Sequence, residues 1–331
     1  MNYSHFVGLD VGKKTFDASL MSLEQKEIGY KSFANTADGI QSMLEWIASY
    51  QLILSKILFC AENMGSYVID LAASSVHHGF PLALVCPLAI KKSIGLQRGK
   101  NDRVDAKRIA YYSTLHHRKL KLYDLPDEDI VQLRSWLVIR NNLVKQKVAT
   151  VALLQTSSRS AKIASMTAST LFLQEQLESI KEKIILVEKQ MEQIIASSTS
   201  LRINYQLLLT ITGIGLINAV VLLCVTDNFH RFTEPRKFAC YCGVAPFEHT
   251  SGISIRGKTK TSALANKEVK VYLTRAAITA IAWDPQMKAY YRRKTEQGKH
   301  KASVINAVRA KIISRCFAVI RRQTPYVSLV A

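Results

Sequence analysis

The sequence has few acidic residues for its length and no long apolar run. It contains 25 Asp and Glu against 45 Lys and Arg, a formal net charge of +20. Its six cysteines form no C-x-x-C pair, which argues against structural zinc. The sequence has no apolar run of about 20 residues, the length that spans a bilayer. Asp10 and Lys13 interrupt the first apolar stretch, which therefore does not resemble a signal peptide. We therefore expect a cytoplasmic protein with no membrane partner.

The positive charge is concentrated late in the chain. Residues 252–322 hold 17 Lys and Arg but only Glu268, Asp284 and Glu296, so this stretch carries +14 of the +20. A hydrophobic content of 48% argues against disorder. Such a basic stretch on a folded chain predicts a surface for a polyanion, nucleic acid first.

Two carboxylates stand close together at Asp102 and Asp105. Their spacing puts them on one face of a helix, one turn apart. At ~4 Å they would repel by roughly 1–4 kcal/mol, so a counter-charge is required. It is either a bound divalent cation or neighbouring basic side chains, namely Lys100, Arg103, Lys107 and Arg108.

The first 125 residues predict an α/β domain. Apolar and alternating patterns predict strands at 5–11, 15–20, 27–33, 57–62 and 81–86. Helices are expected after Asn35 or Thr36, which provide caps, at 67–78, and at the Asp102/Asp105 run. The order β-β-β-α-β-α-β-α is that of the ribonuclease H fold.

In that arrangement four acids from distant parts of the chain meet at one sheet end. Asp10 lies in the first strand, Glu62 ends the fourth, and Asp102 and Asp105 follow the fifth. Such a carboxylate cluster can hold two metal ions for phosphoryl transfer. Asp17, Asp38 and Asp70 match no such position and are expected to be surface or capping acids.

Residues 127–200 predict two long helices with a turn within 156–169. The second helix has a strict heptad stripe, which must be buried against the preceding helix or against another chain. The regularity of the stripe favours self-association. Its members are Leu173, Leu177, Ile180, Ile184, Val187, Met191 and Ile194.

The last 130 residues predict a mostly helical domain. Gly213-Ile214-Gly215 between two apolar helices indicates either a phosphate-binding helix-hairpin-helix or a tight core turn. Residues 243–258 are punctuated by glycine and predict a loop, in which Ser251 would ordinarily be a turn hydroxyl. Helices are expected at 229–242, 267–281, 285–294 and 303–322. The candidate nucleic-acid contacts are Gly213, Gly215, Arg256, Lys258, Lys260, Arg292, Arg293 and Lys294. The last three follow Tyr290 and Tyr291, whose rings could either stack on bases or pack in the core.

Five motifs in one order resemble the insertion-sequence family one-ten of transposases, the DEDD type related to the Piv DNA invertase. They are Gly8-Leu9-Asp10-Val11-Gly12-Lys13, Ala61-Glu62-x-x-Gly65-x-Tyr67, Asn101-Asp102-x-x-Asp105-Ala106, Gly213-Ile214-Gly215, and Gly243-x-x-Pro246 followed by Ser251-Gly252. The resemblance covers nearly the whole chain.

The resemblance implies a RuvC-like domain at 1–125, a coiled-coil connector at 126–200 and a transposase domain at 201–331. It implies that Asp10, Glu62, Asp102 and Asp105 bind Mg²⁺, or alternatively Mn²⁺, and that Ser251 is the nucleophile. It also implies donor and target DNA, a guide (bridge) RNA encoded by the element, and a homo-oligomer, either dimer or tetramer, at the nucleoid of a bacterium or archaeon.

Together these features predict an RNA-guided DNA recombinase that forms a 5′-phosphoserine intermediate. Because Ser251 is distant in sequence from the four acids, the active site would be composite. One alternative is a RuvC-like nuclease or junction resolvase that uses water as its nucleophile. Another is a nucleic-acid-binding protein whose acid cluster is inactive.

Overall fold

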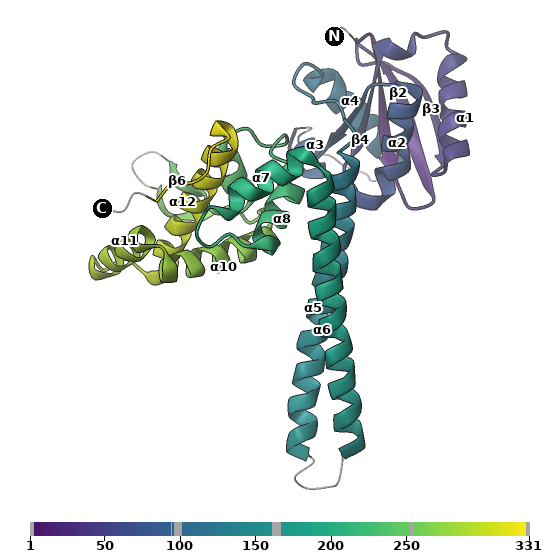
Figure 1. The fold of residues 1–331 in the computed structure, drawn as a ribbon. Helices are drawn as coiled ribbons and strands as arrows, with labels where there is room; N and C mark the ends of the chain where they lie inside the picture. The colour runs from purple at the N-terminus through teal and green to yellow at the C-terminus, as the bar shows by residue number, and fades with distance from the viewer. Residues whose placement is uncertain (1–2, 94, 96–100, 161–166, 252–254, 329–331) are drawn as a thin grey trace. The chain divides into compact units, whose positions relative to one another are not determined.

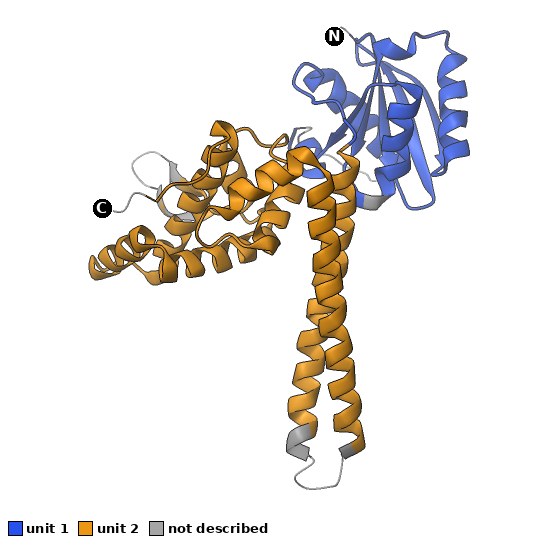
Figure 2. Cartoon of the chain, viewed as in Figure 1, with its two compact units in different colours: residues 1–125 blue, residues 126–331 orange. Residues whose placement is uncertain are grey.

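The computed structural model describes residues 3–93, 95, 101–160, 167–251 and 255–328. The chain divides into two compact units, Met1–Leu125 and Pro126–Ala331 (Figure 2). Among the described helices, none combines the length and hydropathy that a membrane span needs.

The first unit is built on a five-stranded mixed sheet. Strands β1 (His5–Val11), β2 (Thr15–Ser22) and β3 (Glu27–Ala34) form an antiparallel meander, and β4 (Ile57–Glu62) and β5 (Leu82–Val85) add in parallel on the other side of β1. The resulting order is β3-β2-β1-β4-β5. This order and these directions fit the expected ribonuclease H arrangement, and the predicted strand positions are confirmed to within two residues.

Helices cover both faces of this sheet (Figure 1). On one face, α1 (Ala37–Ala48) and α2 (Ile69–His78) share a core with alternate strand residues such as Leu9 and Phe59. On the other, α4 (Asp102–His116) contacts β1, β2 and β4. Short helices at η1 (Leu54–Lys56), η2 (Gly65–Val68) and α3 (Pro87–Ser93) complete the unit. The sequence did not predict α3.

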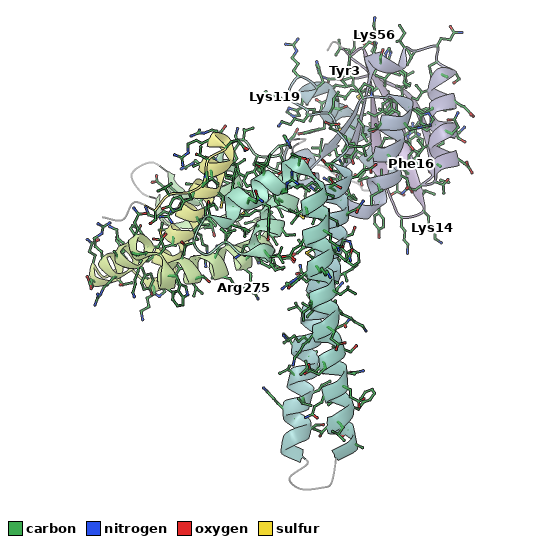
Figure 3. All side chains as sticks on the ribbon, viewed as in Figure 1. Tyr3, Lys14, Phe16, Lys56, Lys119 and Arg275 are labelled. Atoms are coloured by element: carbon green, nitrogen blue, oxygen red, sulfur yellow. The ribbon has the colours of Figure 1, made fainter. Side chains whose placement is uncertain are left out.

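Local chemistry sets the ends of these helices. The Thr36 hydroxyl accepts a hydrogen bond from the Gly39 amide and begins α1, and Gly79 ends α2 in the left-handed region at φ +69°. Exposed lysines such as Lys14, Lys56 and Lys119 project outward, whereas Phe16 lies in the interior (Figure 3).

The second unit begins with a long antiparallel hairpin of α5 (Glu128–Ser160) and α6 (Thr167–Ser197), which lie side by side (Figure 1). The heptad stripe of α6 packs against α5, and an ion pair between Arg140 and Glu188 at 2.7 Å joins the two helices. Of the two partners that the sequence left open for this stripe, the structure shows the preceding helix, and association with another chain stays a prediction.

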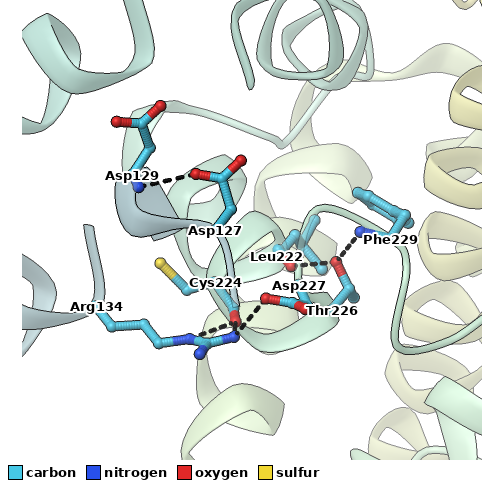
Figure 4. Close-up of polar contacts among 8 residues, drawn as sticks. All are labelled: Asp127, Asp129, Arg134, Leu222, Cys224, Thr226, Asp227 and Phe229. Carbon is cyan, nitrogen blue, oxygen red and sulfur yellow. Dashed lines mark hydrogen bonds and ion pairs between the residues drawn. The ribbon is translucent and has the colours of Figure 1, made fainter. Parts of the chain in front are cut away.

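The base of the hairpin is tied to the helices that follow it (Figure 4). Arg134 of α5 donates through Nε and Nη2 to the carbonyl of Cys224, at 3.0 and 2.8 Å, and through Nη2 to Asp227 at 3.0 Å. Both acceptors lie at the C-terminal end of α8 (Leu216–Thr226), so the guanidinium satisfies a carbonyl of its last turn. This contact joins α5 to the helical part of the unit.

The remaining helices form one core with the base of the hairpin. They are α7 (Thr199–Leu209), α8 (Leu216–Thr226), α9 (Pro235–Tyr241), α10 (Lys267–Trp283), α11 (Pro285–Glu296) and α12 (Lys301–Arg322). Two strands, β6 (Pro246–Ser251) and β7 (Ile255–Thr261), pair antiparallel. The expectation of a loop at 243–258 was therefore wrong, and the expected helix at 229–242 is shorter, beginning only at Pro235.

Candidate active site

Asp10 and Glu62 lie on neighbouring strands of the first unit. β1 and β4 are parallel, and Leu9 pairs with Ala61, so each acid is the next residue along its strand. Side chains alternate between the faces of a sheet. Leu9 and Ala61 belong to the core beneath α1 and α2, which assigns Asp10 and Glu62 to the opposite face, the one that α4 covers.

Gly8 brings α4 onto this face. A Cβ at Gly8 would lie 2.1 Å from the Ala110 amide nitrogen and 2.2 Å from the Ala106 carbonyl oxygen. Only a residue without a side chain allows the helix backbone to approach β1 this closely. Gly8 is two residues before Asp10, so this contact sets the position of α4 relative to the first acid. In the sequence Gly8 stands out only as part of a motif, and no signal there points to this packing role.

Asp102 and Asp105 occupy the first turn of α4. The Asn101 side chain accepts from the Val104 amide at 2.8 Å and begins the helix. Arg108 donates to Asp105 at 2.6 Å, so one of the four basic residues expected near this pair serves as its counter-ion.

Arg103 and Lys107 contribute differently, since both bind Glu27 of β3, at 3.5 and 3.1 Å. These two ion pairs hold the first turns of α4 against the sheet. The fourth expected basic residue, Lys100, lies outside the described residues.

The four acids influence one another electrostatically. The pKa of Asp10 is raised to about 6, most by burial and then by the charges of Asp105, Glu62, Asp102 and Asp17, in that order. The structure therefore brings together all four acids that the sequence selected. Their catalytic and metal-binding roles remain predictions.

The donor chemistry of this acid cluster (Asp10, Glu62, Asp102 and Asp105) suits a hard divalent cation. All four donors are carboxylates, the ligands that Mg²⁺ and Mn²⁺ prefer. Within the described ranges, no three or more His, Cys, Asp or Glu side chains are arranged so that they could hold a metal ion directly. Burial and the neighbouring acids together disfavour the ionised form of Asp10, and a bound cation would favour it.

Asp17 differs from its sequence prediction. It was expected to be a surface or capping acid, but it is only 6% exposed and stands directly opposite Asp10 in the β1–β2 pair. The Tyr30 hydroxyl donates a hydrogen bond to it, and this bond, together with burial and the charge of Asp17, raises the pKa of Tyr30 to about 12. Asp17 is therefore a buried, hydrogen-bonded neighbour of the cluster.

Ser251 is the last residue of β6 in the second unit, where its backbone pairs with Ile255 of β7. Its side chain lies outside the described part of the structure, as do the side chains of Arg256, Lys258 and Lys260. What these four residues contact therefore stays a prediction.

The two hairpin glycines have different surroundings. Gly213 has φ +98°, and a Cβ there would lie 2.4 Å from the carbonyl oxygen of Ala276 in α10. Gly213 thus serves helix packing, which agrees with the core-turn alternative. Gly215 caps the N-terminus of α8, is exposed and has open space around it. Only the second glycine leaves room for a phosphate at a helix N-terminus.

The three basic residues of α11 that the sequence selected also have different surroundings. Arg292 is highly exposed and lies 3.4 Å from Glu296, and Lys294 donates to Gln297 at 3.0 Å. Arg293 has its guanidinium 5.8 Å from the centre of the Tyr290 ring. Of the three, it alone lines a groove between helices.

Comparison with known proteins gives consistent matches along the chain. Residues 7–157 match the IS110-type DEDD family described as "Transposase", and residues 205–292 match the "Transposase IS116/IS110/IS902 family". The pilin gene-inverting proteins of Moraxella lacunata and Moraxella bovis are each 26% identical over 325 residues, covering 97% of this chain and 97% of each relative.

A solved structure, T. thermophilus RuvC in complex with Holliday junction substrate, is 10% identical with a TM-score of 0.30. The match covers 37% of this chain and 100% of that one.

Proposed function

The chain belongs to the IS110 family of transposases, which are DNA recombination enzymes, and from this premise we propose that it cuts and rejoins DNA strands in a reaction that requires Mg²⁺. The observation that carries the proposal is the convergence of Asp10, Glu62, Asp102 and Asp105 from three elements onto one face of the sheet. Arg108 pairs with only one of these acids, Asp105, and a phosphodiester would bring further negative charge to this face.

In this proposal the acid cluster holds the cation, and Mn²⁺ could replace Mg²⁺. The bound cation would supply Lewis-acid stabilisation of the phosphate under attack. Asp10 and Glu62 are fixed by the sheet, and Asp102 and Asp105 by the first turn of α4, so their positions are set before DNA binds. Arg108 pairs with Asp105 in the metal-free chain, and a bound cation would compete with it for this carboxylate.

Ser251 is the proposed nucleophile. Its oxygen would form a bond to phosphorus as the bond to the 3′ oxygen breaks, which gives a 5′-phosphoserine and a free 3′ hydroxyl. Attack by the 3′ hydroxyl of the exchanged strand reverses the step without an external energy source. The acids and Ser251 belong to different units, so strand transfer through Ser251 requires that they meet in the assembled complex.

A guide RNA would supply sequence choice by pairing with donor and target DNA. Within the basic stretch at 252–322, six cations would then hold phosphate backbone and need not read bases, namely Arg256, Lys258, Lys260, Arg292, Arg293 and Lys294. We propose a homo-oligomer as the working form. Its support is a set of exposed apolar side chains on the α5–α6 hairpin, namely Val148, Leu153, Phe172, Ile185 and Leu186.

A suicide DNA substrate tests the proposed chemistry. The full chain with Mg²⁺ should form a covalent protein–DNA adduct, and Ser251→Ala should abolish it. Ser254→Ala is the matched control, because it removes a hydroxyl three residues away in the sequence, and it should retain the adduct. Cleavage without any adduct would instead support the nuclease or junction resolvase that uses water, for which the acid cluster suffices.

A second variant tests the cluster itself. Asp105→Asn should abolish cleavage while DNA binding is retained, and Asp38→Asn, an exposed acid at the start of α1, should leave both unchanged. If wild-type chain binds DNA but never cleaves it under any divalent cation, the protein is a nucleic-acid-binding protein with an inactive cluster.

A further inference from the structure

A groove between α11 and α12 in the second unit joins Arg293 to polar and charged residues that the sequence did not select. Its volume is 1110 Å³. Tyr290 and Arg293 line it from α11, Lys311 and Arg315 line it from α12, and Gln286, Ser314 and Ser328 add side-chain hydrogen-bonding groups. Positive side chains therefore stand on both walls.

One of these cations is already balanced. Arg315 donates through Nη1 to Asp284 at 2.5 Å and through Nη2 to Gln286 at 2.5 Å. Asp284 is buried and also caps α11, accepting from the Met287 amide at 3.1 Å. This pair fixes the start of α11 against α12 and contributes no net charge to the groove.

The other two cations have no such partner. Among the described residues, no carboxylate pairs with Arg293 or Lys311 within ion-pair distance. Instead both lie beside the Tyr290 ring, with the Lys311 ammonium 4.7 Å and the Arg293 guanidinium 5.8 Å from its centre. The ring holds both charges near each other by cation–π attraction. The groove thus has a net charge of +2, with one unbalanced cation from each wall.

We propose that this α11–α12 groove binds the phosphodiester backbone of a nucleic acid, with Arg293 and Lys311 contacting phosphates. Its volume greatly exceeds that of a single phosphate group, and the charge is distributed over both walls, which suits a stretch of backbone better than a free anion. The hydroxyl and amide groups of Ser314, Ser328 and Gln286 are further donors for phosphate oxygens. The proposal rests on the nucleic-acid-binding function proposed above and names where part of that binding occurs.

The test is the salt dependence of binding by the full chain. The double variant Arg293→Gln with Lys311→Gln is compared with wild type on single-stranded RNA, single-stranded DNA and duplex DNA of one sequence. Each phosphate contact contributes about 0.9 to the slope of log K against log salt on duplex DNA and about 0.7 on single strands. Loss of two contacts should reduce the slope by roughly 1.4 to 1.8 on the nucleic acid that occupies the groove.

The matched control is Lys288→Gln with Arg321→Gln. It removes the same charge from exposed positions of the same two helices outside the groove, and it should retain the wild-type slope. A second readout does not depend on a variant. Bound nucleic acid should protect Lys311, and not Lys288, from an amine-reactive reagent, as read by mass spectrometry.

Support requires both the reduced slope and the protection of Lys311, and the nucleic acid that shows them identifies the occupant. If wild type binds nucleic acid but the double variant keeps its slope, or Lys311 stays unprotected, the groove proposal is overturned while the proposed function stands. If wild type binds none of the three nucleic acids, both are overturned.

Discussion

Asp10 is harder to ionise in the folded chain than in the unfolded chain. Its folded-state pKa of about 6 lies above the ordinary value of 3.8, because burial and neighbouring carboxylates disfavour its ionised form. Below about pH 3.8 the residue is protonated in both the folded and the unfolded chain. As the pH rises from 3.8 to about 6, only the unfolded chain ionises readily, so the free energy of unfolding falls across this window and the loss persists above it.

Asp10→Asn should therefore stabilise the metal-free protein at neutral pH. We expect the free energy of unfolding to rise by about 1–2 kcal/mol above pH 6, after allowance for solvent screening of a half-buried group. This gain should shrink towards zero near pH 4. Urea unfolding in EDTA at several pH values measures it, with Asp70→Asn on α2 as the control. Equal destabilisation by Asp10→Asn at every pH would show that Asp10 has a structural role and is not repelled by the cluster.

Arg108 is the internal counter-ion of Asp105, and a bound cation must compete with it. Arg108→Gln should thus tighten Mn²⁺ binding several-fold, whereas Arg103→Gln, which removes an ion pair to Glu27 instead, should not. Titration calorimetry on both variants measures the difference. Weaker binding in Arg108→Gln would mean that Arg108 positions Asp105 for the metal.

At the scale of elements, the close contact between β1 and α4 determines where the acids meet. Gly8→Ala would place a Cβ about 2 Å from backbone atoms of α4, and backbone cannot rotate away as a side chain does. We expect a loss of roughly 1–3 kcal/mol in the free energy of unfolding together with weaker Mn²⁺ binding, because α4 carries Asp102 and Asp105.

The control is Gly12→Ala, whose Cβ would meet only the Thr15 carbonyl at 3.1 Å. Denaturant unfolding and Mn²⁺ titration are the two measurements. If Gly8→Ala destabilises the protein but leaves Mn²⁺ binding unchanged, the close packing of α4 on β1 does not determine the arrangement of the acids.

Elements with a strong pattern were predictable from sequence. The strands of the first unit and the basic helices of the second follow hydrophobic periodicity, and Thr36 caps the helix that was expected to begin there. The β6–β7 hairpin was missed because glycine and polar residues in Pro246–Ser251 and Ile255–Thr261 show no apolar alternation. The position of Asp10 opposite Asp17 depends on strand register, which no local pattern encodes.

The α11–α12 groove was missed for a related reason. Arg293 was expected to contact nucleic acid, but nothing in the sequence pairs it with Lys311, which is 18 residues later on another helix. Which cations are free is equally a tertiary property, since Arg315 is neutralised by Asp284 and Lys311 is not. Sequence identified the basic stretch, and packing decides which of its charges are available.

At the scale of the whole molecule, the exposed apolar side chains of the hairpin predict association between copies. The double variant Ile185→Ser with Leu186→Ser removes side chains that are 67% and 58% exposed, so the fold should be retained. Sedimentation at micromolar concentration should then show a smaller species than wild type. Glu182→Ser with Lys189→Ser, exposed on the same helix, is the control. A wild-type monomer that does not associate even with nucleic acid bound would contradict the proposed oligomer.

The most direct test of the proposed active site is divalent metal binding by the full-length protein. Mn²⁺ titration followed by electron paramagnetic resonance should show tight sites in wild type, weakened at least tenfold by Asp10→Asn, Glu62→Gln, Asp102→Asn and Asp105→Asn, and unaffected by Asp38→Asn. If Mn²⁺ binding survives in all four amide variants, these carboxylates do not form a metal site, and the proposed chemistry is wrong.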